Sequence, residues 1–281
     1  MVSRLTTFLG LALLTISVGC KKVADVEFGD TGPKTEALGL ARGISIKAID
    51  FHQGIEIPLM EDGSAIKTTK RPVEALAGRD AMVRVFLKRD DDWVDRNVRV
   101  VFTMVTNGET HTQEIEGFVD ANSKQKTLKT TFNFDWKNEQ IGTDTTWSVA
   151  IHETTIDADY AGSEESTQFP ADGSKQDLAA VDTDEITVLI IPIKYKADGS
   201  NRLPDTSDEQ MKDLKKLLYS MYPVTKVNIE IDDPLSWDKV IDPSGDGWGS
   251  LLSNIAARRQ TANVDPQTYY YAMFNPEPTF G

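Results

Sequence analysis

Residues 81–87 read Ala-Met-Val-Arg-Val-Phe-Leu, and this stretch decides the fold of the first half of the chain. Successive side chains of an extended strand point to opposite faces of a sheet. Every second residue from Ala81 to Leu87 is apolar and would share one face, while Arg84 would lie on the other. This alternation predicts a β-strand with one face in a hydrophobic core.

Alternations of the same kind recur on both sides of this stretch, with no helical period between them. They cover residues 44–48, 55–59, 98–104, 128–134 and 147–151. The turn signals that separate them are Asp62-Gly63, Asn107-Gly108 and Ile141-Gly142. An Asn-Gly pair favours a type I′ hairpin turn, because both positions need positive φ. Residues 43–155 are therefore predicted to form an antiparallel β-sandwich of immunoglobulin-like type.

Residues 183–281 have a different pattern, which begins with the nearly continuous apolar run 186–193. Such a run is typical of a strand that is buried on both faces. Ser207 is a good N-cap for a helix that Pro223 would end, and a second helix is predicted over residues 248–260. Further strands are predicted over residues 227–231 and 268–274. This order indicates a partial α/β domain whose helices cover little more than one face of the sheet.

The N-terminus resembles a lipoprotein signal peptide. The apolar run that ends at Gly19 has no charge and is too short, as a helix, to cross a hydrocarbon core of about 30 Å. It leads into Ser17-Val18-Gly19-Cys20, which resembles a bacterial lipobox. We expect residues 1–19 to be cleaved and Cys20 to carry lipid, including a palmitate-type acyl chain. By resemblance to Gram-negative lipoproteins, Lys21 favours the outer membrane over the inner membrane.

Composition agrees with an exported, folded protein. The formal net charge is −14, so nucleic acid and anionic lipid headgroups would be repelled. Cys20 is the one cysteine, which excludes an internal disulfide. We interpret the glycine-containing residues 20–42 as a lipidated flexible tether and the polar residues 156–182 as an acidic linker.

No catalytic motif and no metal-ligand motif is found. The three histidines, His52, His111 and His152, have no second histidine within helical reach, so the HExxH pattern of zinc peptidases is absent. His152 should face solvent. An Asn107-Gly108 turn would place His111 opposite the core residue Met104, and this conflict suggests that the predicted register or facing of the strand is off by one residue. We expect no catalytic residue, no metal ligand and no tight zinc binding in these 281 residues.

Two acidic loops could each supply oxygen ligands for calcium. They are Asp198-Gly199-Ser200-Asn201 and the segment from Asp242 to Asp246. Neither has the spacing of an EF-hand loop, and a solvated turn is the better interpretation of both.

The chain resembles secreted lipoproteins of myxobacterial type over residues 43–281. The resemblance is carried by Gly78–Phe86, Ile191–Ser207, Met221-Tyr222-Pro223, Gly247-Trp248 and Tyr269–Tyr271. In that family a β-sandwich precedes a zincin-like metallopeptidase domain, whose zinc-binding helix comes after the region matched here. The resemblance therefore implies a metallopeptidase whose catalytic motif, and whose zinc, belong to a longer form continuing beyond Gly281.

The alternative is a noncatalytic cell-envelope lipoprotein whose β-sandwich binds a protein or a polysaccharide. Either way we expect a location in the cell envelope, anchored to a membrane through covalent lipid. The partner would be an extracellular or periplasmic protein or peptide, and not nucleic acid. The sequence does not distinguish between substrates or oligomeric states.

Overall fold

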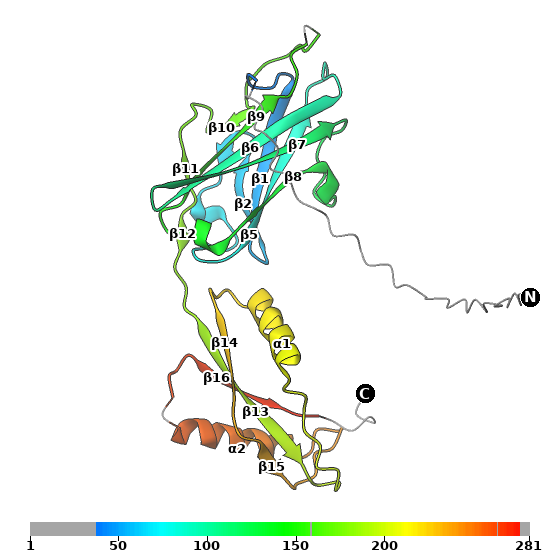
Figure 1. Cartoon of the computed structure of the whole chain (residues 1–281), viewed down its shortest axis with the longest axis vertical. Helices are drawn as coiled ribbons and strands as arrows, with labels where there is room; N and C mark the ends of the chain where they lie inside the picture. Colours follow the sequence, from blue (N-terminus) through cyan, green and yellow to red (C-terminus); the bar gives the residue numbers. More distant parts are fainter. Residues whose placement is uncertain (1–37, 158, 263, 276–281) are drawn as a thin grey trace, which may run out of the picture. The chain divides into compact units, whose positions relative to one another are not determined.

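The structure is a computed structural model that describes residues 38–157, 159–262 and 264–275 (Figure 1). Within these ranges the chain is mostly β-sheet. Antiparallel sheets make up most of the part before residue 178, and a parallel sheet with two helices follows from residue 186. The predicted change of architecture between the two halves of the chain is therefore confirmed at this coarse level.

Two five-stranded antiparallel sheets form the first part. The strand order of the first is β3-β2-β1-β5-β8; in the second it is β10-β9-β6-β7, with β11 also paired to β9. The bounds of the first sheet are β1 Ile44–His52, β2 Glu56–Glu61, β3 Ser64–Ala65, β5 Ala81–Arg89 and β8 Phe132–Trp136. Those of the second are β6 Arg96–Thr106, β7 Glu109–Val119, β9 Thr146–Glu153, β10 Gln168–Phe169 and β11 Gln176–Asp177. The small parallel pair β4 (Ala75–Leu76) and β12 (Ala180–Val181) lies beside them. Single 3-10 turns cover Thr68–Lys70, Leu128–Thr130 and Asn138–Gln140.

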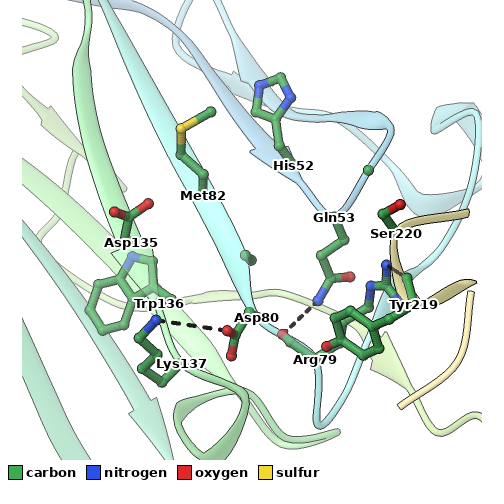
Figure 2. Close-up of a pocket in the computed structure, with 12 residues that line it drawn as sticks. His52, Gln53, Arg79, Asp80, Met82, Asp135, Trp136, Lys137, Tyr219 and Ser220 are labelled. Atoms are coloured by element: carbon green, nitrogen blue, oxygen red, sulfur yellow. Dashed lines mark hydrogen bonds and ion pairs between the residues drawn. The ribbon is translucent and has the colours of Figure 1, made fainter. Parts of the chain in front are cut away.

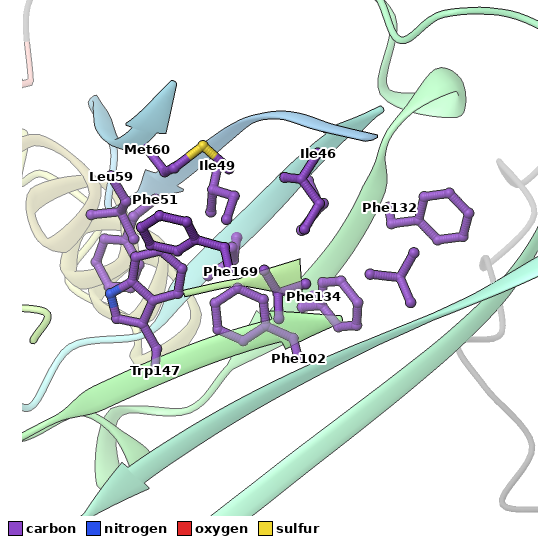
Figure 3. Close-up of a cluster of buried hydrophobic side chains, with 14 of the residues drawn as sticks. Ile46, Ile49, Phe51, Leu59, Met60, Phe102, Phe132, Phe134, Trp147 and Phe169 are labelled. Carbon is purple, nitrogen blue, oxygen red and sulfur yellow. The ribbon is translucent and has the colours of Figure 1, made fainter. Parts of the chain in front are cut away.

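One hydrophobic core is shared by both sheets, so this part is β-sandwich-like (Figure 3). The predicted face of β5 is confirmed, because every second residue from Ala81 to Leu87 is buried. Phe102 on β6 lies at the centre of an aromatic cluster. Its ring centroid is 5.6 Å from that of Phe134 and 5.7 Å from those of Trp136 and Trp147. Bulky rings from strands of both sheets thus fill the interior.

The Asn107-Gly108 turn is confirmed, with φ angles of 52° and 77°. The turn sets the register that pairs Met104 with His111. The predicted register is therefore not shifted by one residue. The polar residue His111 can pair with Met104 because β7 is an edge strand. His111 keeps 20% of its side chain exposed there, whereas Met104 is fully buried.

The predicted linker at residues 156–182 is wrong for its second half. Phe169 on β10 and Leu178 are buried in the sandwich core, and β10 and β11 both pair with β9. The predicted tether also extends too far. Ala41 is fully buried, and its amide donates to the Ile151 carbonyl at 2.9 Å. Residues 38–42 therefore belong to the sandwich.

The second part is built around β13 (Ile186–Tyr195). This strand pairs in parallel with β14 (Val227–Ile231), β15 (Leu235–Trp237) and β16 (Thr268–Met273). The sequence predicted all of these except β15. Helix α1 spans Asp208–Met221, and the Ser207 hydroxyl accepts from the Gln210 amide at its start, as predicted. Helix α2 spans Trp248–Thr261.

Each face of β13 is covered by one helix, which corrects the expectation that the two helices would cover little more than one face. Met211 of α1 packs with Val188 and Ile190, whereas Leu251 and Ile255 of α2 pack with Ile191 and Ile193. The apolar residues at helical spacing, predicted to form one buried stripe within residues 211–221 and another within 251–256, are only partly buried. Leu217, Met221 and Leu252 are exposed.

Candidate functional site

Cys20, the predicted lipid-attachment residue, lies outside the described residues. The three histidines lie on separate strands: His52 on β1, His111 on β7 and His152 on β9. The expected solvent-facing position of His152 is wrong. Its side chain is half-buried, and Nδ1 lies 3.1 Å from the carbonyl oxygen of Leu38. Residues 38–42, which the sequence placed in the tether, account for this difference.

His52 forms a cluster with two carboxylates, Asp50 and Glu56. Asp50 and His52 are two residues apart on β1 and so share the face that points away from the sandwich core. Glu56 opens β2 and pairs directly with His52 across the hairpin. One ligand atom from each of the three side chains lies within 4.8 Å of the other two.

The cluster is held under a covering segment. Asp50 is only 5% exposed although it lies on the outer face of the sheet. The Gln125 side-chain amide donates to Asp50 Oδ2 at 3.4 Å and also to Glu56 Oε2. Arg84 lies opposite Asp50 on β5, but its Nη2 donates to the Gln125 carbonyl at 3.1 Å. One amide nitrogen therefore bridges two carboxylates.

Burial perturbs the two members of the cluster that lie on β1, Asp50 and His52. Desolvation, strengthened by the charge of Glu56, raises the pKa of Asp50 to about 6. Burial also lowers the pKa of His52, which favours neutral imidazole. His52 Nε2 is buried, and it has no hydrogen-bond partner within the described residues. The cluster therefore combines one acid that resists ionisation, Asp50, with an imidazole nitrogen that lacks a hydrogen-bond partner among the described residues.

A hollow lies next to the cluster, lined by His52, Gln53, Asp80 and Lys137 among others (Figure 2). Arg79 also lines it and is the most deeply buried cation there. Its guanidinium donates to the carbonyls of Tyr219, Tyr222 and Val224 at 2.6–2.9 Å. These contacts engage Arg79 as a structural anchor.

The acidic loops weighed as calcium ligands form local turns. Asp198 accepts from both the amide and the hydroxyl of Ser200 and pairs with Arg202 at 2.6 Å. These contacts lower the pKa of Asp198 to about 2. The second loop is similar, since Asp242 accepts from the Ser244 amide at 2.8 Å. The interpretation as turns is supported in both cases.

The Asp50–His52–Glu56 cluster contains one histidine, so the pairs of histidines that mark zinc motifs in a sequence do not reveal it. A usable signal was present: an Asp-x-His pair just after the predicted alternation of residues 44–48, with Glu56 four residues further on in the next alternation. The covering role of Gln125 has no such signal, because 69 positions separate it from Glu56.

No protein-family model and no curated protein sequence matches the chain. Among the described residues, neither helix is long and apolar enough to cross a membrane.

Proposed function

We propose that the chain is the membrane-anchored front part of an exported cell-envelope lipoprotein of the zinc-metallopeptidase type. In this proposal the first part is an immunoglobulin-like sandwich, and the second is the beginning of a zincin-like domain whose zinc-binding helix belongs to a longer form. Lipid on Cys20 would hold the protein at the outer membrane.

The observation that carries the proposal is the parallel layer around β13. Its strands and helices follow the order strand, helix, strand, helix, strand, with one short extra strand. This is the support that a metal-binding helix needs in the resembled family. The outer edge of β16 pairs with no other strand among the described residues. An exposed edge of this kind can take an extended peptide by strand addition, which suits a peptide substrate.

Anchoring and peptidase activity are tested separately. When the chain is expressed in a Gram-negative host, it should fractionate with membranes and incorporate radioactive palmitate, and Cys20→Ala should abolish the label. Label that persists in Cys20→Ala refutes the anchor. Casein cleavage should be confined to a longer form that contains an HExxH helix. Cleavage of casein by the 281-residue chain itself refutes the proposal that the catalytic motif belongs to a longer form.

A second function is favoured by the Asp50–His52–Glu56 cluster, which lies on the sandwich and not on the α/β part. In this case the sandwich would bind a protein or polysaccharide, and the lipoprotein would be noncatalytic. Failure of every natural form of the protein to cleave casein, together with retention of a ligand by the sandwich, would select this function.

A further inference from the structure

The carboxylates of Asp50 and Glu56 and the imidazole of His52 form a ligand set that no motif in the sequence assigns. We propose that they bind a divalent transition-metal ion of the zinc class on the outer face of the sandwich. The proposal does not rest on the peptidase function, and it departs from the expectation of no tight zinc binding, which considered histidine pairs alone.

The backbone of two paired strands already brings the three ligands together. His52 and Glu56 are direct cross-strand partners, and Asp50 is two residues before His52 on the same face. Ligands on paired strands keep their backbone spacing, so the metal would not have to order a loop in order to gain three donors. The donor atoms already lie within 4.8 Å of one another.

The two carboxylates are only partly balanced by positive charge, since Arg84, opposite Asp50 on β5, favours the ionised form of Asp50 by its charge but forms no ion pair with it. Two carboxylates lie side by side, and within the described ranges neither forms an ion pair with a lysine or arginine. The nearby Arg84 guanidinium is instead placed over the Phe86 ring, with its carbon 4.7 Å from the ring centroid. A divalent cation would balance the two carboxylates.

His52 Nε2 is buried and has no hydrogen-bond partner among the described residues, although polar atoms in such positions are nearly always paired. When the imidazole is neutral, its unprotonated nitrogen can donate a lone pair to a metal. Coordination through Nε2 would therefore satisfy an atom that the described residues leave without a hydrogen-bond partner.

The ligand types select the ion. Imidazole suits zinc and its neighbours, whereas calcium and magnesium prefer sites made only of oxygen. Three protein ligands with one open position for water is the usual arrangement of a reactive zinc site. Zinc–ligand distances of about 2.0–2.2 Å imply donors roughly 3.5 Å apart, so the cluster must contract. Glu56 is exposed and can rotate inward, and Gln125 would then hold the carboxylates from outside the ligand sphere.

The experiment uses the full chain with Cys20→Ser, which removes the one thiol that could bind metal. Zinc chloride is titrated by calorimetry into metal-free protein, and each variant is first checked for folding by circular dichroism and thermal melting. We expect one zinc per chain. Affinity should fall at least tenfold in His52→Gln and Asp50→Asn. It should fall about 10-to-100-fold in Gln125→Ala, the usual loss when an outer-sphere partner is removed.

His111→Gln is the matched control, because His111 also has a glutamate nearby, with Nε2 4.0 Å from Glu109 Oε2. This variant should bind zinc as the parent does, and excess calcium should not displace the zinc. Cobalt in place of zinc should give a visible absorption band that His52→Gln alters. Absence of zinc binding in the parent overturns the proposal, as does unchanged affinity in folded His52→Gln or an equal loss in His111→Gln.

Discussion

Replacing Glu153 by glutamine should destabilise the sandwich far more than neutralising any exposed ion pair. Glu153 and Arg96 are 9% and 5% exposed at their side chains. Arg96 Nη2 donates to Glu153 Oε1 at 2.7 Å, and Arg96 Nε donates to Oε2 at 2.9 Å. The guanidinium carbon lies 3.7 Å from the ring centroid of Trp93 and 4.0 Å from that of Tyr160.

The pair also fixes the first described residues of the chain. Glu153 Oε1 accepts from the Arg42 amide at 3.0 Å, and Arg96 donates to the Arg42 carbonyl at 2.7 Å. In Glu153→Gln the buried guanidinium would keep its charge and lose its counter-ion. Breaking a buried pair in this way costs about 3–5 kcal/mol. We expect a loss near the lower end, about 3 kcal/mol, since glutamine retains one acceptor.

Urea unfolding measures this loss as a shift in midpoint at constant m-value. The control is Asp95→Asn, because Asp95 pairs with Arg89 at 2.8 Å while the two side chains are 49% and 30% exposed. An exposed pair contributes about 0–1 kcal/mol. A loss below about 1 kcal/mol in Glu153→Gln, or an equal loss in Asp95→Asn, would refute the reasoning.

Three further predictions concern the core, the cluster and the loops. Phe102→Ala should cost about 3–5 kcal/mol in urea unfolding, since its ring contacts three others and would leave a cavity; a loss below about 1 kcal/mol would contradict the packing. In metal-free buffer, the raised pKa of Asp50 makes the free energy of unfolding depend on pH. The contribution of protonated Asp50 to stability is fully present below pH 4 and is lost as the pH rises through about 6. Asp50→Asn should therefore gain stability relative to the parent between pH 4 and 7, by at most about 3 kcal/mol at about 1.4 kcal/mol per pKa unit; a gain that is independent of pH would be the contrary result. Limited proteolysis should cut first beside Ile156, which is 83% exposed, and should spare residues 168–181; early cleavage near Phe169 would contradict the pairing of β10.

The strands of the sandwich were predictable because alternation reports directly which side chains enter a core. Val98, Val100, Phe102 and Met104 are all fully buried, as their spacing predicts. The Asn107-Gly108 turn was predictable because few residues tolerate positive φ. These are local signals, and the residues that produce them lie close together in the chain.

The incorrect prediction of a linker over residues 156–182 shows the limit of what local sequence patterns can predict. Residues 168–181 contain Phe169 and the short apolar run Leu178–Val181 separated by mostly polar residues, so no regular alternation is visible there. What holds this segment is backbone pairing to β9 and the burial of Phe169 and Leu178 in a core formed by distant strands. Backbone pairing leaves no trace in side-chain pattern, and a polar segment that lies on a sheet edge therefore reads as a loop.

The Asp50–His52–Glu56 cluster depends both on a local pattern that the sequence shows and on long-range contacts that it does not show. Alternation along β1 places Asp50 on the polar face, where the sequence alone predicts contact with water. The structure buries it, because Gln125 and the segment around Thr131 lie over that face and position Arg84 beside it. Burying an acid beside Glu56 costs stability, and hydrophobic residues at these positions would avoid that cost. Stability alone therefore does not explain why these three side chains are together. The proposed cation does, because the two carboxylates that repel each other in its absence would both be attracted to it as ligands.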